Sequence, residues 1–402
     1  MKKNSFIYQV KYVVLSLLAA AVVGLLCMLL VYLLPVDKMK AKVMESASIQ
    51  MIEKDRHVWA PNVISSSLDG FTDSIMLNIA VHPGSGNVLR DATDNACTWN
   101  VGLEGSTADI LVVNVLSDNH GGISEYHYGR YWHGYLVFLK PMLLLFNYGE
   151  IRFILMSLEL VLLFVYFYLL CKKLGWLKSI PFLVAFLALN PISSMLSLQF
   201  ADIFIITLVG GICILNYDEN KWQETWKVFL WIGIFTAYVD LLTYPLVGLG
   251  FNLILWCVLD KENSQFKKCM YSLAYSVYWL VGYALMWAAK WIMSITFNDL
   301  TLKNVVDQIF NRTAGDINTP DIQNDSIFNA IVVNVQDMFS GPIIALIIIS
   351  VIFVVILVIV KRASLIGISN TLPLLFVALY PFIWCLIIRQ HSALHAFLEL
   401  GA

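Results

Sequence analysis

The chain has 402 residues, of which 59% are hydrophobic and 13% charged, whereas an ordinary soluble domain has roughly 45–50% and about 25%. This composition excludes a soluble enzyme and predicts an all-α polytopic membrane protein whose apolar surface lies in the lipid bilayer. The formal net charge is −2, so the chain has no basic excess to neutralise nucleic-acid phosphates. We expect no nucleic-acid partner.

Apolar segments long enough to cross a bilayer follow one another along most of the chain. The first has 23 residues without a charge, whereas the apolar core of a signal peptide has only about 7–15. We therefore expect residues 1–34 to form a retained N-terminal anchor. Nine spans are predicted, at 12–34, 150–171, 179–196, 201–217, 226–241, 244–259, 268–296, 341–360 and 367–388.

The positions of Lys and Arg between these spans predict their direction, because cytoplasmic connections are enriched in both residues. The tight turns near 191–202 and 239–245 hold neither. We therefore expect the side rich in Lys and Arg to be cytoplasmic, with the N-terminus on it. Thirteen basic residues share this side: Lys2, Lys3, Lys11, Lys172, Lys173, Lys178, Lys221, Lys227, Lys261, Lys267, Lys268, Lys361 and Arg362.

The opposite, extracytoplasmic face is predicted to carry the chemistry, because all seven His fall on it. One apolar stretch there, 131–146, carries Lys140 and Pro141 in its interior. We expect it to be a helix lying at the outer membrane interface, not a further span. The predicted organisation is an anchor over 1–34, an extracytoplasmic loop over 35–149, a transmembrane bundle over 150–296, a second outer loop over 297–340, and the last two transmembrane helices with an outer tail over 341–402.

The predicted inner connections are too short to hold a nucleotide-binding domain. The sequence contains neither the GxxxxGK[ST] nor the GxGxxG pattern of nucleotide-binding loops. Any substrate must therefore arrive already activated. Among the cysteines only Cys97 lies in an outer loop, and no CxxC occurs, so neither an external disulfide nor a thiolate metal site is expected.

The first candidate for chemistry is the segment SSSLDGFTDSIMLN over 65–78. Its apolar residues recur at helical spacing, while Asp69 and Asp73 lie four residues apart on the other face. Two carboxylates at that spacing repel each other, which favours a cation or proton between them, or a base with a raised pKa. The alternative is a surface helix that residues 65–67 cap and whose positive end Asp69 favours.

Three further outer residues are candidates. Asp37 directly follows the first span, where a carboxylate can reach a lipid phosphate but where a polar residue also simply ends a span. Arg130 and His133 stand among aromatic residues in EYHYGRYWH at 125–133. Arg can hold a phosphate there and the rings can stack on sugars. The alternative is an aromatic belt with a snorkelling Arg.

Ionisable residues inside spans are costly in lipid and therefore informative. Lys290 lies toward the outer end of its span, at a depth that suits either a lipid phosphate or a snorkelling side chain. Asp240 lies at an outer span end, where it binds substrate or, like Asp202, only marks a turn. For Glu159 we expect a structural hydrogen bond to a neighbouring helix.

The layout of the chain resembles the C-type fold of polytopic glycosyltransferases that use polyprenyl-phosphate sugars. The shared features are one span, a large outer segment with acidic residues and an interfacial helix, and then many closely spaced spans. The chain also resembles a group of bacterial membrane proteins associated with surface-polysaccharide assembly, in the pieces LDGFTDSIMLN (68–78), YGRYWHGYLVFLKP (128–141), YVDLLTYPLVGLG (238–250) and HSALH (391–395).

The resemblance implies that an outer acid acts as a base or metal ligand and that basic groups hold the lipid phosphate. Asp69 and Asp73 match the group's segment, whereas Asp37 matches only the fold's habit of placing an acid after the first span. The outer loop contains no adjacent Asp-Asp or Asp-Glu pair, which departs from the fold's pattern. His391 and His395 have a spacing that suits two ligands of one metal, but no third ligand is identified. A divalent cation is left open as a cofactor.

These observations predict transfer of a sugar from a polyprenyl-phosphate donor to a cell-surface glycan or glycolipid, by an inverting displacement on the outer face. The alternatives are a flippase or transporter, a polymerase of lipid-linked glycan, and a non-catalytic scaffold for envelope-assembly proteins. A flippase should line an intramembrane path with several charges. Only Glu159 and Lys290 lie well within predicted spans, which favours the enzyme.

Overall fold

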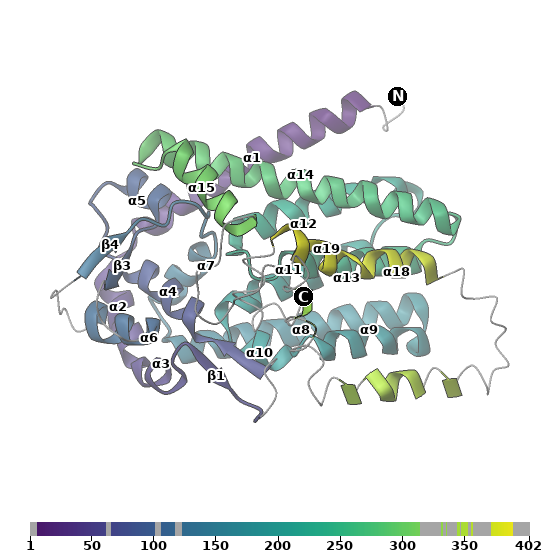
Figure 1. Cartoon of the computed structure of the whole chain (residues 1–402), viewed down its shortest axis with the longest axis horizontal. Coiled ribbons are helices and arrows are strands. Elements are labelled where there is room, and N and C mark those ends of the chain that lie inside the picture. Colours follow the sequence, from purple (N-terminus) through teal and green to yellow (C-terminus); the bar gives the residue numbers. More distant parts are fainter. Residues whose placement is uncertain are drawn as a thin grey trace.

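The structure, a computed structural model of the whole chain, is mainly helical (Figure 1). Its long helices lie together on one side, and a layer of short helices and strands lies on the other. The residues that it describes are 6–61, 66–100, 106–116, 123–313, 331–332, 335, 344–345, 347–352, 355–356 and 371–388.

The short elements between the first long helix and the helical bundle form a unit that we call the cap region, residues 36–142. Two antiparallel strand pairs brace it: Arg56 of β1 lies opposite Asp69 of β2, and Cys97 of β3 lies opposite Tyr126 of β4. The predicted outer loop is therefore a folded layer. Its elements are α2 (Val36–Glu45), α3 (Ala47–Glu53), β1 (Arg56–Val58), β2 (Ser67–Asp69), α4 (Gly70–Val81), α5 (Val88–Asp94), β3 (Cys97–Asn100), α6 (Thr107–Asp109), the π-helix η2 (Ile110–Leu116), β4 (Ile123–Tyr126) and α7 (Leu136–Met142).

The helical bundle is built from long apolar helices that pack along one another. Helix α12 packs against α14, and α11 packs against both α8 and α13. The elements are α1 (Phe6–Tyr32), α8 (Tyr148–Leu174), α9 (Trp176–Ala188), α10 (Pro191–Met195), α11 (Leu198–Leu215), the 3-10 helix η3 (Glu219–Glu224), α12 (Trp226–Val239), α13 (Pro245–Leu259), α14 (Gln265–Phe297), α15 (Leu302–Thr313), α18 (Leu372–Ala378) and α19 (Tyr380–Ile387).

Four of these helices, α1, α8, α11 and α14, are long and apolar enough to cross a membrane. The chain is therefore an all-α membrane protein. Shorter apolar helices α9, α12 and α13 also fall on predicted spans. The predicted span 179–196 is divided, because α9 ends at Ala188 and α10 begins at Pro191. The full set of nine spans stays a prediction.

Helices α1 and α12 contact each other at both of their ends. Lys227 at the start of α12 donates to the hydroxyl of Tyr8 at the start of α1 (2.9 Å), and Tyr238 near the end of α12 donates to the carbonyl of Gly24 (2.9 Å). The two helices therefore run parallel.

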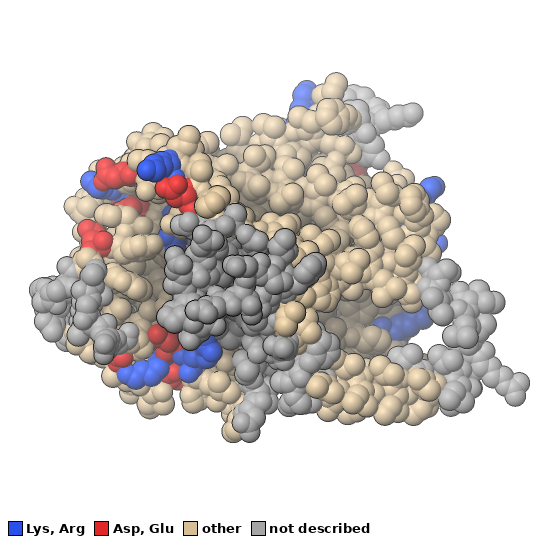
Figure 2. Space-filling view, viewed as in Figure 1, with Lys and Arg blue, Asp and Glu red and all other residues tan. Residues whose placement is uncertain are grey.

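Figure 2 shows acidic and basic side chains gathered over the cap region, whereas the bundle's surface in this view is mostly uncharged, with only basic residues at its far edge. This separation agrees with the charge pattern of the sequence.

Glycines allow α12 and α14 to pack with their backbones in contact. A Cβ atom at Gly233 of α12 would lie 2.1 Å from the carbonyl oxygen of Trp279. A Cβ atom at Gly282 of α14 would lie 2.4 Å from the carbonyl oxygen of Leu230. Neither helix can carry a side chain at these positions without moving.

We expect Gly282→Ala to lower the thermal unfolding temperature of the detergent-solubilised protein, because overpacking a tight contact costs about 1–3 kcal/mol. Gly250→Ala is the matched control, since a Cβ atom there has no neighbour within 4 Å. Alanine is the better helix former, so the control should be neutral or slightly stabilising. Equal unfolding temperatures for the two variants would contradict the close packing of α12 on α14.

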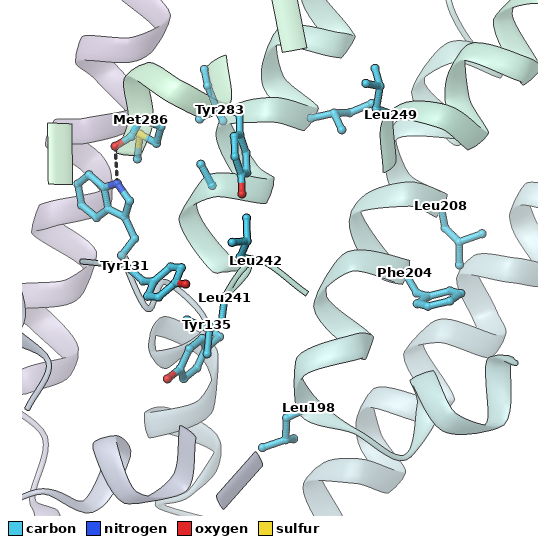
Figure 3. Close-up of a cluster of buried hydrophobic side chains, with 14 of the residues drawn as sticks. Tyr131, Tyr135, Leu198, Phe204, Leu208, Leu241, Leu242, Leu249, Tyr283 and Met286 are labelled. Atoms are coloured by element: carbon cyan, nitrogen blue, oxygen red, sulfur yellow. Dashed lines mark hydrogen bonds between the residues drawn. The ribbon is translucent and has the colours of Figure 1, made fainter. Parts of the chain in front are cut away.

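The segment predicted as an interfacial helix lies at the junction of the cap region and the bundle. Only Leu136–Met142 are helical, as α7. Tyr131, Trp132 and Tyr135 are buried, and the indole of Trp132 donates to the carbonyl of Met286 in α14 (2.7 Å; Figure 3). These aromatic residues thus pack inside the protein and do not form an exposed interfacial surface.

Candidate functional site

Four carboxylates from three parts of the chain gather where the cap region meets the bundle. Asp69 precedes α4, Asp73 lies in its first turn, Asp202 lies one turn into α11, and Asp240 directly follows α12. Asp202 lies close enough to both Asp73 and Asp240 to interact with them electrostatically. Asp73 interacts in the same way with Asp69. We call these four residues the carboxylate cluster.

Asp69 is held by a helix start. Its Oδ1 accepts from the backbone N–H of Thr72 (2.9 Å), which makes it the N-cap of α4. Its own backbone N–H donates to the hydroxyl of Ser197 (3.1 Å) just before α11. The residue is only 1% exposed, and Oδ2 has no hydrogen-bond partner among the described residues. One oxygen of Asp69 is therefore fixed, and the other is buried without a hydrogen-bond partner among the described residues.

Asp73 has the opposite arrangement, because both of its oxygens are used. Oδ2 accepts from the hydroxyl of Tyr148 (2.7 Å) and from the backbone N–H of Leu198 (3.0 Å), and Oδ1 accepts from the backbone N–H of Gln199 (3.3 Å). A carboxylate is favourable at a helix N-terminus, where backbone N–H groups lack partners. Asp73 therefore docks α4 onto the first turn of α11.

Gln199 connects this docking point to Asp240. Its side-chain amide donates to Oδ1 of Asp240 (2.9 Å), which also accepts from the backbone N–H of Thr243 (3.0 Å). Oδ2 of Asp240 and Oδ2 of Asp202 are buried and have no hydrogen-bond partner among the described residues. Including Asp69, three carboxylates thus each present one unpartnered oxygen.

Burial sets the acidity of the two cap-region carboxyls. It raises the pKa of Asp69 to about 6, against the lowering effect of the hydrogen bonds from Thr72. Burial, followed by the nearby Asp69, raises the pKa of Asp73 to about 7. A carboxyl that titrates near neutrality can take up and release a proton under physiological conditions. Because Asp69 also has a free oxygen, it is the better placed of the two for proton transfer.

An apolar groove of about 610 Å³ lies beside the cluster, between α7, α8, α11 and α12. Asp202 is the only charged residue in the described wall of this groove, and Tyr135 is another polar residue there. The rest of the wall is largely aliphatic and aromatic, including Leu155, Ile206 and Phe235. The groove therefore leads from the surface of the apolar helices to the carboxylate cluster.

Arg130, which is predicted to bind phosphate, lies on the other side of the turn 131–135. Arg130 stacks against the ring of Tyr128 (4.3 Å from its centre) and donates to the hydroxyl of Tyr126 (2.7 Å). It lines a cavity of about 410 Å³ whose wall is rich in aromatic residues, the aromatic cavity. Tyr131 lines this cavity, whereas Tyr135 lines the apolar groove.

Lys290 and His133 both contact other parts of the protein in this structure, and their predicted roles in substrate binding stay predictions. The ammonium group of Lys290 donates to the carbonyl of Thr93 (2.8 Å) and to Oδ1 of Asn95 (2.6 Å), which fixes the end of α5 on α14. The His133 ring contacts the Tyr135 hydroxyl (2.9 Å) and the Tyr128 carbonyl (3.1 Å). Burial, reinforced by Lys290, holds the pKa of His133 well below its usual 6.5. Both nitrogens of the His133 ring are thus engaged by protein groups in this structure.

Asp37 does not join the cluster. It is exposed in the first turn of α2, where it favours the positive end of that helix. His391 and His395 lie outside the described residues. Among the described residues no three His, Cys, Asp or Glu side chains come close enough to hold a metal ion. The carboxylate cluster as described thus does not fit a divalent cation, and we assign no step to a metal.

The sequence suggested a different arrangement for Asp69 and Asp73. They do not share the polar face of a surface helix, because α4 begins at Gly70 and all of its residues except Phe71 are buried. Residues 66–67 do not cap it either. Asp202 and Gln199 were not expected in the site. Their signal was present, since two polar side chains at the start of an apolar helix, just after a predicted outer turn, are expected to face protein.

Comparison with known proteins adds no further information on the site. No family model, curated protein or solved structure matches the chain.

Proposed function

We propose that the protein transfers a sugar from a polyprenyl-phosphate donor to a glycan or glycolipid acceptor at the outer face of the membrane, in the manner of the C-type glycosyltransferases that its layout resembles. One observation carries the proposal. Asp69, a buried carboxylate with an unpartnered oxygen and a pKa of about 6, lies in a cluster that borders an apolar groove. This combination suits a reaction between a long-chain lipid and a hydroxyl group.

In the proposed reaction, Oδ2 of Asp69 accepts the proton of the acceptor hydroxyl while that oxygen attacks the anomeric carbon of the donor sugar. The bond from the anomeric carbon to the phosphate oxygen breaks, and the polyprenyl phosphate leaves with the bonding electrons. Attack opposite to the leaving group inverts the anomeric centre. Asp73 positions α4 on α11 and so holds Asp69 in place, and Asp240 and Asp202 are available for the sugar hydroxyls.

The apolar groove is the proposed site of the donor's isoprenoid chain. It opens between helices whose outer surfaces carry exposed apolar residues such as Leu158, Val209 and Phe235, so a lipid can enter from the bilayer without crossing water. A chain lying in the groove would bring its polar end to Asp202 and the cluster.

The direct test is reconstitution in liposomes with a polyprenyl-phosphate sugar and a glycan acceptor, followed by chromatography of the glycan. Formation of a lengthened glycan together with free polyprenyl phosphate supports the proposal. Movement of a labelled polyprenyl-phosphate sugar across the bilayer without transfer would instead indicate a flippase. Absence of both activities with a range of donors would leave only a scaffold role.

The proposal requires the cap region to face outward, as the distribution of Lys and Arg predicts. A single Cys introduced at Pro83, which is exposed in the cap region, should react with a membrane-impermeant maleimide on intact cells. A single Cys at Ser264, exposed before α14 at the opposite end of the bundle, should react only after lysis. The native cysteines are replaced in both variants. Labelling of Ser264→Cys on intact cells would reverse the orientation.

A further inference from the structure

The aromatic cavity is a second concave site that the proposed reaction does not use. It lies where the ends of α14 and α19 meet the cap region, and its wall includes Tyr131, Trp287, Trp291 and Trp384. Polar groups at the rim come from the cap region and from α15. A cavity of about 410 Å³ with aromatic walls and a few polar groups has the size and character of a small-molecule site.

Two buried donors in this wall have no acceptor. The Nε atom of Arg130 and the Nε1 atom of Trp287 are inaccessible to solvent and lack hydrogen-bond partners among the described residues. Buried donors are normally paired, because leaving one unpaired costs free energy. A ligand that presents oxygen acceptors in the cavity would pair with both donors when the two side chains turn toward it.

The charged residues around the cavity favour the binding of an anion, because the acidic ones have basic partners and Arg130 has no acidic partner among the described residues. The acidic residues of the wall already have basic partners: Asp94 binds Nδ1 of His127 (2.6 Å), and Asp299 binds Arg90 (2.8 Å). Arg130 has no carboxylate within ion-pair distance among the described residues, and its neighbours are the tyrosines of its own segment. The guanidinium group is therefore the one charge in the described wall that lacks a counter-ion.

We propose that the aromatic cavity binds a pyranose sugar that carries a negative charge. Arg130 and Trp287 donate to the anionic group and to ring hydroxyls, and His127, fixed by Asp94, presents Nε2 to a further hydroxyl. Aromatic faces contact the apolar C–H face of the ring. The bound sugar belongs either to the acceptor glycan, as a uronic acid, or to the donor, as a sugar phosphate. Only this assignment to a substrate rests on the proposed function.

Isothermal titration calorimetry of the full chain in nanodiscs tests the cavity without any transfer reaction. The probes are glucuronic acid, glucose 1-phosphate and glucose. We expect both anionic sugars to bind at least tenfold more tightly than glucose. Stronger binding of glucuronic acid would assign the cavity to the acceptor glycan, and stronger binding of glucose 1-phosphate would assign it to the donor.

Two substitutions separate charge from hydrogen bonding. Arg130→Gln should remove the preference for anionic sugars. Trp287→Phe keeps an aromatic ring and loses the N–H, so it should weaken the binding of all three probes severalfold. Arg130→Lys, which keeps the charge, serves if the glutamine variant does not fold, and it should retain part of the preference. The controls are Lys303→Gln and Trp176→Phe, since both side chains are exposed and neither lines the cavity.

Absence of saturable binding, equal binding of glucose and the anionic sugars, or an unchanged preference in Arg130→Gln would each overturn the inference. The result is independent of catalysis. Sugar binding without transfer would preserve this site and reject the proposed function, whereas transfer that depends on Asp69 without sugar binding here would do the reverse.

Discussion

Asp69→Asn should lower the rate of sugar transfer by about 10²–10⁴, the usual contribution of a positioned general base. The substitution is informative because it preserves the helix cap. Asn is as good an N-cap as Asp, so its side-chain oxygen can still accept from the N–H of Thr72 and keep the start of α4 in place. What is lost is the proton acceptor at Oδ2. The measurement is kcat/KM for glycan formation in liposomes.

Asp218→Asn is the matched control, because Asp218 is also the N-cap of a helix and accepts from the N–H of Asn220. It lies in the connection before α12, away from the cluster, and should leave the rate unchanged. If both variants transfer sugar at the wild-type rate, Asp69 is only a helix cap and the enzyme loses its proposed base.

The pH dependence of the wild-type rate provides a second readout of the same residue. Asp69 must be deprotonated to accept a proton, and its pKa is about 6. The transfer rate should therefore rise with pH up to about 6 and level off above it. This rising limb should be missing from the residual activity of Asp69→Asn.

The long helices of the bundle follow from the sequence because their signal is local. An uncharged apolar run such as that of α1 can be recognised from the sequence alone. The corresponding predicted spans begin and end within a few residues of α8, α11 and α12. The cap region was harder to predict. Its short strands and helices are stabilised by contacts with distant elements, such as that of Ser197 with Asp69, and no local pattern encodes these contacts.

The candidate site was predictable in its residue types and not in its geometry. A pair of acids four residues apart identified Asp69 and Asp73, yet Asp240, which is linked to Asp73 through Gln199, lies far away in the chain. The spacing rule also assumed that Asp69 lies within a helix, whereas it caps one. For Lys290, the sequence did not show that its ammonium group donates to a backbone carbonyl of the cap region.

The same Asp69→Asn substitution that removes the base should make the protein more stable above neutral pH. The pKa of Asp69 rises on folding from its ordinary 3.8 to about 6, so the folded state binds a proton more tightly than the unfolded state. The stability that this group contributes is full below about pH 4 and is lost as the pH rises through about 6. Above that range, the folded protein has to bury a charged carboxylate.

Asn carries no charge at any pH and therefore avoids this cost. Two pKa units correspond to a free-energy difference on the order of 3 kcal/mol, so the thermal unfolding temperature of Asp69→Asn should exceed that of wild type by several degrees near pH 8. Near pH 4 the two proteins should unfold at similar temperatures. The partly buried His82 has a lowered pKa and titrates in the opposite direction, but it is present in both proteins and cancels in the comparison. An advantage of Asp69→Asn that is independent of pH would show that its carboxyl is not the titrating group. If the gain in unfolding temperature grows with pH and the transfer rate is lost, the charge of Asp69 serves the reaction, because the same charge destabilises the folded protein.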